Sequence, residues 1–173
     1  MSALDILEKT GVEPGALTQL QRILVVTDGT LSDILEAAAL ERIRLVKLSQ
    51  ETVPSTRSDD WLRPARGEKF LARKILLQGS RTGTNYVYAE SVIALDRLPP
   101  RFDDELVRSN TPLGQLWLEH RLETFKELLE LRYERADERS KHFNCDVSAM
   151  LLARTYGVFS AGVPVMTITE FIP

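Results

Sequence analysis

The sequence predicts an α+β fold in a single domain of 173 residues, built on a mostly antiparallel sheet. Four short runs rich in β-branched and aromatic residues predict strands at 44–53, 70–79, 85–95 and 163–172. The loop at 79–85 joins two of these runs, and Ser160-Ala161-Gly162 precedes the last one, so both loops predict hairpins. Consecutive hairpins favour an antiparallel sheet, whose apolar face helices must cover.

Two helix starts accompany these strands. Thr30 or Ser32 can cap a helix that we place near residues 32–43, because the following apolar residues approximate one helical face. Thr111 followed by Pro112 offers an N-cap and the favoured first-turn proline, so another helix is expected to begin there.

Three other segments lack a clear pattern. Residues 51–69 and 96–114 combine prolines with polar residues and predict two long loops, the first with room for a short helical turn. Residues 121–143 are ambiguous, since their residue types favour a helix while several apolar positions also alternate as in a strand. The local evidence alone favours a helix there.

Composition narrows the classes of function. The net charge of −3 arises from 22 basic and 25 acidic residues spread along the chain, so no broad positive field predicts nucleic-acid binding. A single cysteine, Cys145, and two histidines are too few for a typical structural zinc site and suit a reducing cytoplasm. No leader pattern and no apolar run of about 18 residues predicts secretion or membrane insertion.

Arg73 is a cation inside an apolar run. In FLARKILL, strand alternation places Arg73 on the face of Leu71, Ile75 and Leu77, with Lys74 opposite. One of the two cations therefore faces inward, where a guanidinium needs a carboxylate from the protein or from a ligand. An arginine at a sheet margin or in an internal ion pair is the structural alternative.

Glu170 is the corresponding anomaly near the C-terminus. In MTITEFI it shares a strand face with Met166 and Ile168. Burial makes a carboxyl group easier to keep protonated, so that it can act as a general acid near neutral pH. A glutamate at a frayed strand end is an equally good interpretation of the residues alone.

Two further segments can bring helix N-termini to a ligand. NTPLGQL places Gly114 in a first turn, and TDGTLSD begins the earlier helix. Free backbone N–H groups at such ends can donate hydrogen bonds to carboxylate or hydroxyl oxygens of a ligand, although most of them bind water or the capping residue of their own helix. Neither segment is a phosphate loop.

Five sequence blocks together resemble the chorismate pyruvate-lyase family, in its mycobacterial and cyanobacterial-type branch. They run in order from about Leu17 to Phe171: TDGTLSDILEA, FLARKILLQG, YVYAESVIALDRLP, NTPLGQLWLEHRLETFKE and ARTYGVFSAGVPVMTITEF. The resemblance implies a chorismate lyase-like domain over 1–173, with an antiparallel sheet of about six strands and flanking helices. It also implies that the LETFKELLEL region is a strand.

The resemblance carries over specific roles. Its essential arginine falls on Arg73 and the glutamate of its C-terminal TE motif falls on Glu170, which implies that these two residues are catalytic. Its backbone contacts to the ligand fall on Leu31 and on Leu113, and its TPLG turn includes Gly114. The implied substrate is chorismate, cleaved to 4-hydroxybenzoate and pyruvate by a cytoplasmic enzyme without metal or cofactor, and a monomer is the default.

An R-x-Y element of the family falls on Arg154 and Tyr156, and the resemblance assigns it no role. Two other positions depart from the family pattern. Ser91 stands where the enterobacterial pattern has a second arginine, and Gly157 stands where a basic residue usually follows the tyrosine. The resemblance leaves two alternatives open. One is a ligand-sensing domain like those of related transcription regulators, which bind small molecules without converting them. The other is a related enzyme that acts on another cyclohexadienyl acid or gives a different hydroxybenzoate isomer.

Overall fold

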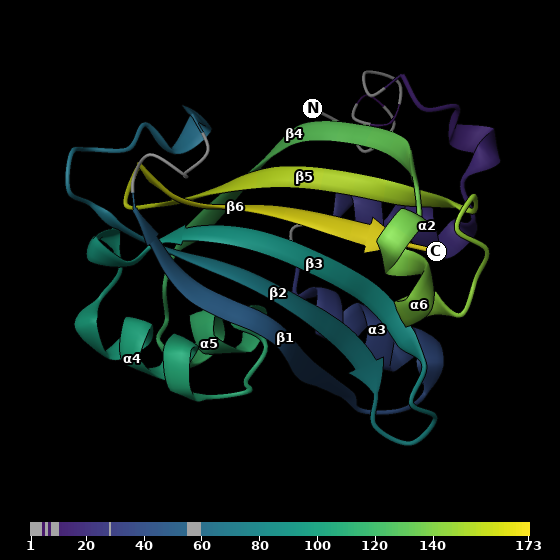
Figure 1. The fold of residues 1–173 in the computed structure, drawn as a ribbon, viewed down its shortest axis with the longest axis horizontal. Coiled ribbons are helices and arrows are strands. Elements are labelled where there is room, and N and C mark those ends of the chain that lie inside the picture. Colours follow the sequence, from purple (N-terminus) through teal and green to yellow (C-terminus); the bar gives the residue numbers. More distant parts are fainter. Residues whose placement is uncertain (1–4, 6, 8–10, 28, 55–59) are drawn as a thin grey trace.

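The sheet confirms the predicted fold class. The computed structural model describes residues 5, 7, 11–27, 29–54 and 60–173 (Figure 1). Six strands pair antiparallel in the order β1-β2-β3-β6-β5-β4. Their bounds are β1 Ile43–Pro54, β2 Lys69–Gly79, β3 Asn85–Ala94, β4 Thr124–Arg135, β5 Met150–Ser160 and β6 Val163–Ile172. All four predicted strands are present, and so are both predicted hairpins.

The α-helices are short and stand mainly on one side of the sheet. They are α2 Gln19–Val26, α3 Leu31–Ala39, α4 Pro100–Arg108, α5 Leu113–Glu119 and α6 Ser140–Phe143. Figure 1 shows α2 to α5 behind the curved sheet and α6 near the ends of β3 and β6. The main core forms where apolar residues of α2 to α5, such as Leu24, Leu35, Phe102 and Leu116, pack against the strands.

The predicted end of the first helix is wrong. We expected it near residue 43, but α3 ends at Ala39, because Leu40 adopts a left-handed conformation with φ of 54°. Ile43 already pairs with Gly79 in the sheet. The expected start of the later helix is one residue early, since Pro112 rather than Thr111 is the N-cap of α5 and no side chain caps it.

The two predicted loops are only partly irregular. Residues 96–114 contain α4, which the sequence analysis missed and which begins at Pro100. The first loop holds the expected helical turn as the 3₁₀ helix η3, Asp60–Leu62, while residues 55–59 lie outside the described part of the chain.

The LETFKELLEL part of the ambiguous segment lies almost wholly in a strand, as the family resemblance implied, whereas its last residues form the 3₁₀ helix η5, Asp137–Arg139, and α6. β4 pairs with β5 from Thr124 opposite Ser160 to Arg135 opposite Met150, with a bulge between Leu128 and Glu130. Its residue types favour a helix, but pairing with β5 overrides a helix propensity worth only a few tenths of a kcal/mol per residue. β4 is an edge strand, so most of its outward side chains remain polar.

Candidate functional site

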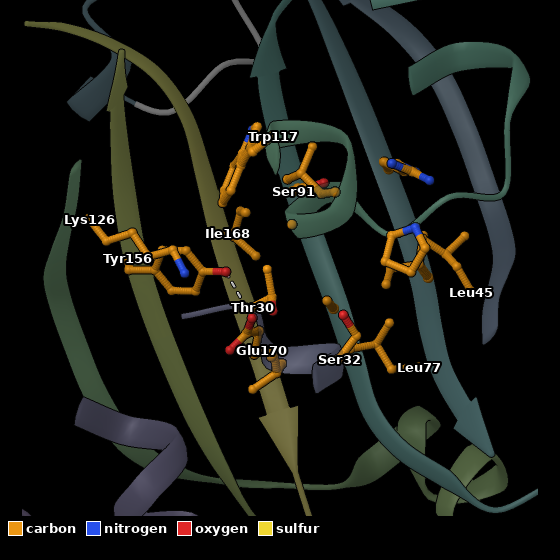
Figure 2. A pocket seen from close by; sticks show the side chains of 17 residues that line it. Thr30, Ser32, Leu45, Leu77, Ser91, Trp117, Lys126, Tyr156, Ile168 and Glu170 are labelled. Carbon is orange, nitrogen blue, oxygen red and sulfur yellow. Dashed lines mark hydrogen bonds between the residues drawn. The ribbon is translucent and has the colours of Figure 1, made fainter. Parts of the chain in front are cut away.

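A cavity of about 80 Å³ lies between the sheet and the first residues of α3 and α5 (Figure 2). The residues that line it come from every strand of the sheet and from both helix starts: Thr30, Leu31, Ser32, Leu45, Arg73, Ile75, Leu77, Ala89, Ser91, Pro112, Leu113, Gly114, Trp117, Lys126, Tyr156, Ile168 and Glu170. All the residues expected at the site from the sequence therefore meet at one place.

Strand register explains how residues far apart in sequence converge. Arg73 on β2 pairs with Ser91 on β3, Ser91 pairs with Ile168 on β6, and Ile168 pairs with Tyr156 on β5. Side chains opposite one another in a sheet point to the same face. These four side chains therefore form a row across the floor of the cavity.

A second row runs beside the first, two residues along each strand. It includes Ala89 on β3, Glu170 on β6 and Arg154 on β5, which are register partners. Glu170 therefore reaches the cavity from the middle of the sheet, with Arg154 beside it.

Arg73 is a buried cation with unused donors. Its residue is 3% exposed, and neither Nε nor Nη2 has a hydrogen-bond partner among the described residues. Burial lowers the pKa of Arg73 to about 10, which still leaves it protonated at neutral pH. The internal ion pair that was the structural alternative is not found within the described chain, so the site is built to receive an anion.

Glu170 lies in a buried hydrogen-bonded cluster. Nε and Nη2 of Arg154 donate to its Oε2 at 3.1 and 2.6 Å, and the Tyr156 hydroxyl donates to its Oε1 at 2.8 Å. Nη1 of Arg154 donates to the carbonyl oxygen of Leu24 in α2. Glu170 is thus held firmly in place and is not a frayed strand end.

The two partners of Glu170 respond to its charge. Burial, the largest single effect, opposes the charge on Arg154, but the charges and hydrogen bonds of Glu170 and Tyr156 together outweigh it, and the pKa of Arg154 is raised. Burial and then the charge of Glu170 raise the pKa of Tyr156 well above its usual value, so its hydroxyl remains a donor. The R-x-Y element whose role was unassigned positions the carboxylate.

The two helix starts form the cavity wall opposite the sheet. Leu31 is the first residue of α3 and Leu113 is the first residue of α5, and N–H groups at such positions have no partner within their helix. Gly114 allows the close approach, since a Cβ there would lie 2.7 Å from Cγ2 of Thr30.

Two lining residues were missed by the sequence analysis. Lys126 and Trp117 both face the cavity, and Lys126 Nζ lies 5.6 Å from the ring centroids of Trp117 and Tyr156. Lys126 lies in the ambiguous segment 121–143. If the segment is a strand, as the resemblance implied, alternation places Lys126 on the same face as Leu128. This strand interpretation was the signal that could have identified Lys126.

The two departures from the family pattern have different surroundings. Ser91 lies in the cavity beside Arg73, so no second arginine extends from β3. Gly157 lies on the other face of the sheet, where a Cβ would be only 2.2 Å from the indole of Trp61. The basic residue usual in the family would displace Trp61 from this contact.

None of the helices in the described ranges is long and apolar enough to cross a bilayer. The same ranges hold no group of three or more His, Cys, Asp or Glu side chains placed to bind one metal ion.

The fold and the site together define an α+β protein with a small cavity between a six-stranded antiparallel sheet and two helix starts, which a buried arginine and a buried carboxylate face. Comparison with known families is more specific. The profile described as "Chorismate pyruvate-lyase Rv2949c-like" matches residues 25–173. The chain belongs to this family.

Named relatives agree with the family assignment. The chain is 31% identical to the chorismate pyruvate-lyase of Mycobacterium leprae over 87% of this chain and 72% of that protein. It is 30% identical to the chorismate pyruvate-lyase of Mycobacterium tuberculosis strain H37Rv, over 86% of this chain and 77% of that protein.

Solved structures with a similar fold include domains of transcriptional regulators. The effector domain of PhnF from Mycobacterium smegmatis superposes with a TM-score of 0.65 at 11% identity, covering 85% of this chain and 90% of that chain. A GntR-family transcriptional regulator from Enterococcus faecalis gives a TM-score of 0.59 at 10% identity, covering 74% and 91%. At such low identity these likenesses show the fold alone.

Proposed function

We propose that this protein is a lyase that cleaves chorismate into 4-hydroxybenzoate and pyruvate. The observation that carries the proposal is the unpaired, buried guanidinium of Arg73 facing the same cavity as the Glu170 carboxylate. Membership of the chorismate pyruvate-lyase family supports the substrate. The proposal includes action in the cytoplasm as a monomer, without metal or organic cofactor.

The spacing of the two groups suits the substrate ring. Arg73 is on β2 and Glu170 on β6, two strands away and two residues further along, which places their Cα atoms about 12 Å apart on the sheet. Chorismate carries its ring carboxylate at C1 and its hydroxyl at C4, opposite each other. We place the ring carboxylate on Arg73 and C4 beside Glu170, with the N–H groups of Leu31 and Leu113 near the substrate oxygens.

The reaction breaks one carbon–oxygen bond and moves one proton from C4 to the leaving group. The bond between C3 and the ether oxygen breaks, C4 loses its hydrogen as a proton, and the ring becomes aromatic. The enolpyruvyl oxygen leaves with the bond electrons, and its methylene carbon takes up a proton to give pyruvate. Aromatisation supplies the driving force, so the protein has to orient the substrate and carry the proton.

Glu170 is our candidate for the proton carrier. Donors on both of its oxygens, from Arg154 and Tyr156, suit a carboxylate, the form that accepts a proton. We therefore refine the general-acid role expected from the sequence: Glu170 first takes the C4 proton and then returns it to the leaving group.

The direct test is incubation of the purified protein with chorismate, with and without a metal chelator, while pyruvate and 4-hydroxybenzoate are quantified by chromatography. Equal formation of both products is expected, unchanged by the chelator and abolished in Arg73→Ala. Glu170→Gln should lower kcat by about 10²- to 10⁴-fold, the range typical of general acid–base groups. An enzyme that releases pyruvate with a different aromatic acid would disprove the assigned product.

A ligand-sensing function is the second candidate. Its support is the likeness of the fold to regulator effector domains, together with Ser91 in place of a second arginine. Tight binding of chorismate or 4-hydroxybenzoate without any turnover would favour the sensor over the lyase.

A further inference from the structure

The cavity holds two cations on different strands. Among the described residues that line it, Arg73 on β2 and Lys126 on β4 are the cationic ones. The substrate of the proposed function carries two carboxylates, and a buried charge needs an opposite charge nearby. Ser91 lies in the row between these strands and supplies no charge. The second carboxylate therefore requires a partner other than a residue of β3.

Lys126 is held at the Tyr156 end of the cavity. Its Nζ donates to the carbonyl oxygen of Gly29 at 3.0 Å and lies 5.6 Å from the centroids of the Trp117 and Tyr156 rings. The Tyr156 hydroxyl in turn donates to Glu170. Figure 2 shows Lys126 next to Tyr156 on one side of the cavity, with Leu45 and Leu77 on the other.

The sheet separates the two cations. Four steps of about 4.8 Å lead from β2 through β3, β6 and β5 to β4, so the backbones of Arg73 and Lys126 are about 19 Å apart along the sheet. Lys126 lies two residues along β4 from Leu128, the register partner of Tyr156, so the two long side chains enter one cavity from strands at opposite ends of the sheet order. Such an arrangement suits a ligand with a separate anionic group at each end.

The pose of the ring limits where the enolpyruvyl group can lie. With the ring carboxylate on Arg73 and C4 beside Glu170, C3 is one of the two ring neighbours of C4, and we place it on the Tyr156 and Lys126 side, where the cavity lining has its second cation. We infer that Lys126 binds the carboxylate of the enolpyruvyl side chain, the part that leaves as pyruvate. This inference rests on the proposed function and adds a substrate-binding residue to it.

The role inferred for Lys126 predicts different effects on the binding of the substrate and on the binding of the aromatic product. Chorismate would use both cations, whereas 4-hydroxybenzoate has a single carboxylate and would use only Arg73. Loss of Lys126 should therefore weaken chorismate binding and leave the affinity for 4-hydroxybenzoate nearly unchanged. Loss of Arg73 should weaken both.

The experiment compares Lys126→Met with Lys74→Met in the full chain. Lys74 lies on the opposite face of β2, 52% exposed, so its substitution removes the same charge away from the cavity. KM and kcat for chorismate are measured by pyruvate release, and the Kd of 4-hydroxybenzoate by calorimetry.

In Lys126→Met we expect KM to rise about 10- to 100-fold, the range for loss of a hydrogen bond to a charged group. The Kd of 4-hydroxybenzoate should change less than about 2-fold, and Lys126→Arg should recover part of the loss.

Other outcomes overturn the inference in distinguishable ways. An unchanged KM in Lys126→Met, with an active wild type, rejects the role of Lys126 and leaves the lyase intact. Equal weakening of both ligands means that Lys126 acts only by holding the Gly29 segment. If the wild type has no turnover, the lyase proposal fails, and the Kd of chorismate then replaces KM in the same comparison, where an equal Kd in Lys126→Met and wild type rejects the binding role.

Discussion

Nη2 of Arg154 donates to Oε2 of Glu170 at 2.6 Å, and the two side chains are only 3% and 5% exposed. A buried ion pair contributes little net stability, but removal of one partner leaves an uncompensated charge in the interior. The pair is therefore better understood as a device that fixes the direction of the Glu170 carboxylate toward the cavity.

This relationship gives the first prediction. Arg154→Met should lower the free energy of unfolding by about 3–5 kcal/mol, because Glu170 is left buried without a cation. Adding Glu170→Gln to the same chain should restore part of the loss, since the double variant buries no unpaired charge. Urea denaturation of the wild type, both single variants and the double variant measures these energies. A double variant less stable than Arg154→Met alone would contradict the explanation.

Tyr156 gives a second prediction that separates positioning from stability. Tyr156→Phe removes the donor to Oε1 of Glu170 and keeps the ring. We expect unfolding free energy to fall by about 1 kcal/mol and kcat to fall about 10-fold, because one hydrogen bond to the carboxylate is lost. Tyr133→Phe, on the edge strand β4 and outside the cavity lining, is the matched control and should retain full turnover. Equal kcat values for the two variants would exclude a positioning role for Tyr156.

Glu41 gives a pH prediction far from the cavity. Its carboxylate accepts hydrogen bonds from the Thr82 hydroxyl, from the backbone N–H groups of Arg81 and Thr82, and from the Tyr86 hydroxyl. These bonds, that of the Thr82 hydroxyl foremost, lower the pKa of Glu41 from 4.5 to about 2. Because the folded-state pKa is the lower one, this stabilisation is present above pH 4.5 and is lost as the pH falls towards 2.

The measurement is a carboxyl NMR titration combined with urea denaturation. Glu41 should titrate with a midpoint near 2, and wild type should lose more stability than Glu41→Gln between pH 4.5 and pH 2. A midpoint near 4.5 would show that the hairpin between β2 and β3 is not held by this carboxylate in solution.

Local patterns were sufficient for four of the six strands and for the strand faces of two site residues. Alternation put Arg73 and Glu170 on faces shared with apolar residues, although it left open whether Arg73 or Lys74 faces inward, and both Arg73 and Glu170 line the cavity. The sequence could not show that Arg154 would pair with Glu170, because that contact depends on the register of β5 against β6. Nor could it show Lys126 facing the cavity, because its segment has the residue types of a helix until β5 pairs with it.

The ligand contacts of Leu31, Leu113 and Gly114 were predicted from the family resemblance and not from strand alternation. The positions of Leu31, Leu113 and Gly114 at the cavity agree with contact to a ligand, but their contribution to binding has to be measured. The absence of a basic residue at Gly157 has a local physical reason, since Trp61 fills the space where its side chain would begin. No single-sequence pattern reveals such a contact between a loop residue and a distant strand.

Gly114 gives the last prediction, which concerns the distance between the two helix starts. Gly114→Ala would place a Cβ 2.7 Å from Cγ2 of Thr30, closer than atoms pack in proteins, so α5 must move away from α3. Because Leu31 and Leu113 line the cavity from these helices, their N–H groups would separate, and KM for chorismate should rise about 10-fold with a smaller change in kcat. Thr30→Ser removes the obstructing methyl group and keeps the hydroxyl that bonds to Asp33. The double variant Gly114→Ala with Thr30→Ser should therefore regain most of the wild-type KM, and if it does not, the effect of the alanine arises from helix α5 itself rather than from its contact with α3.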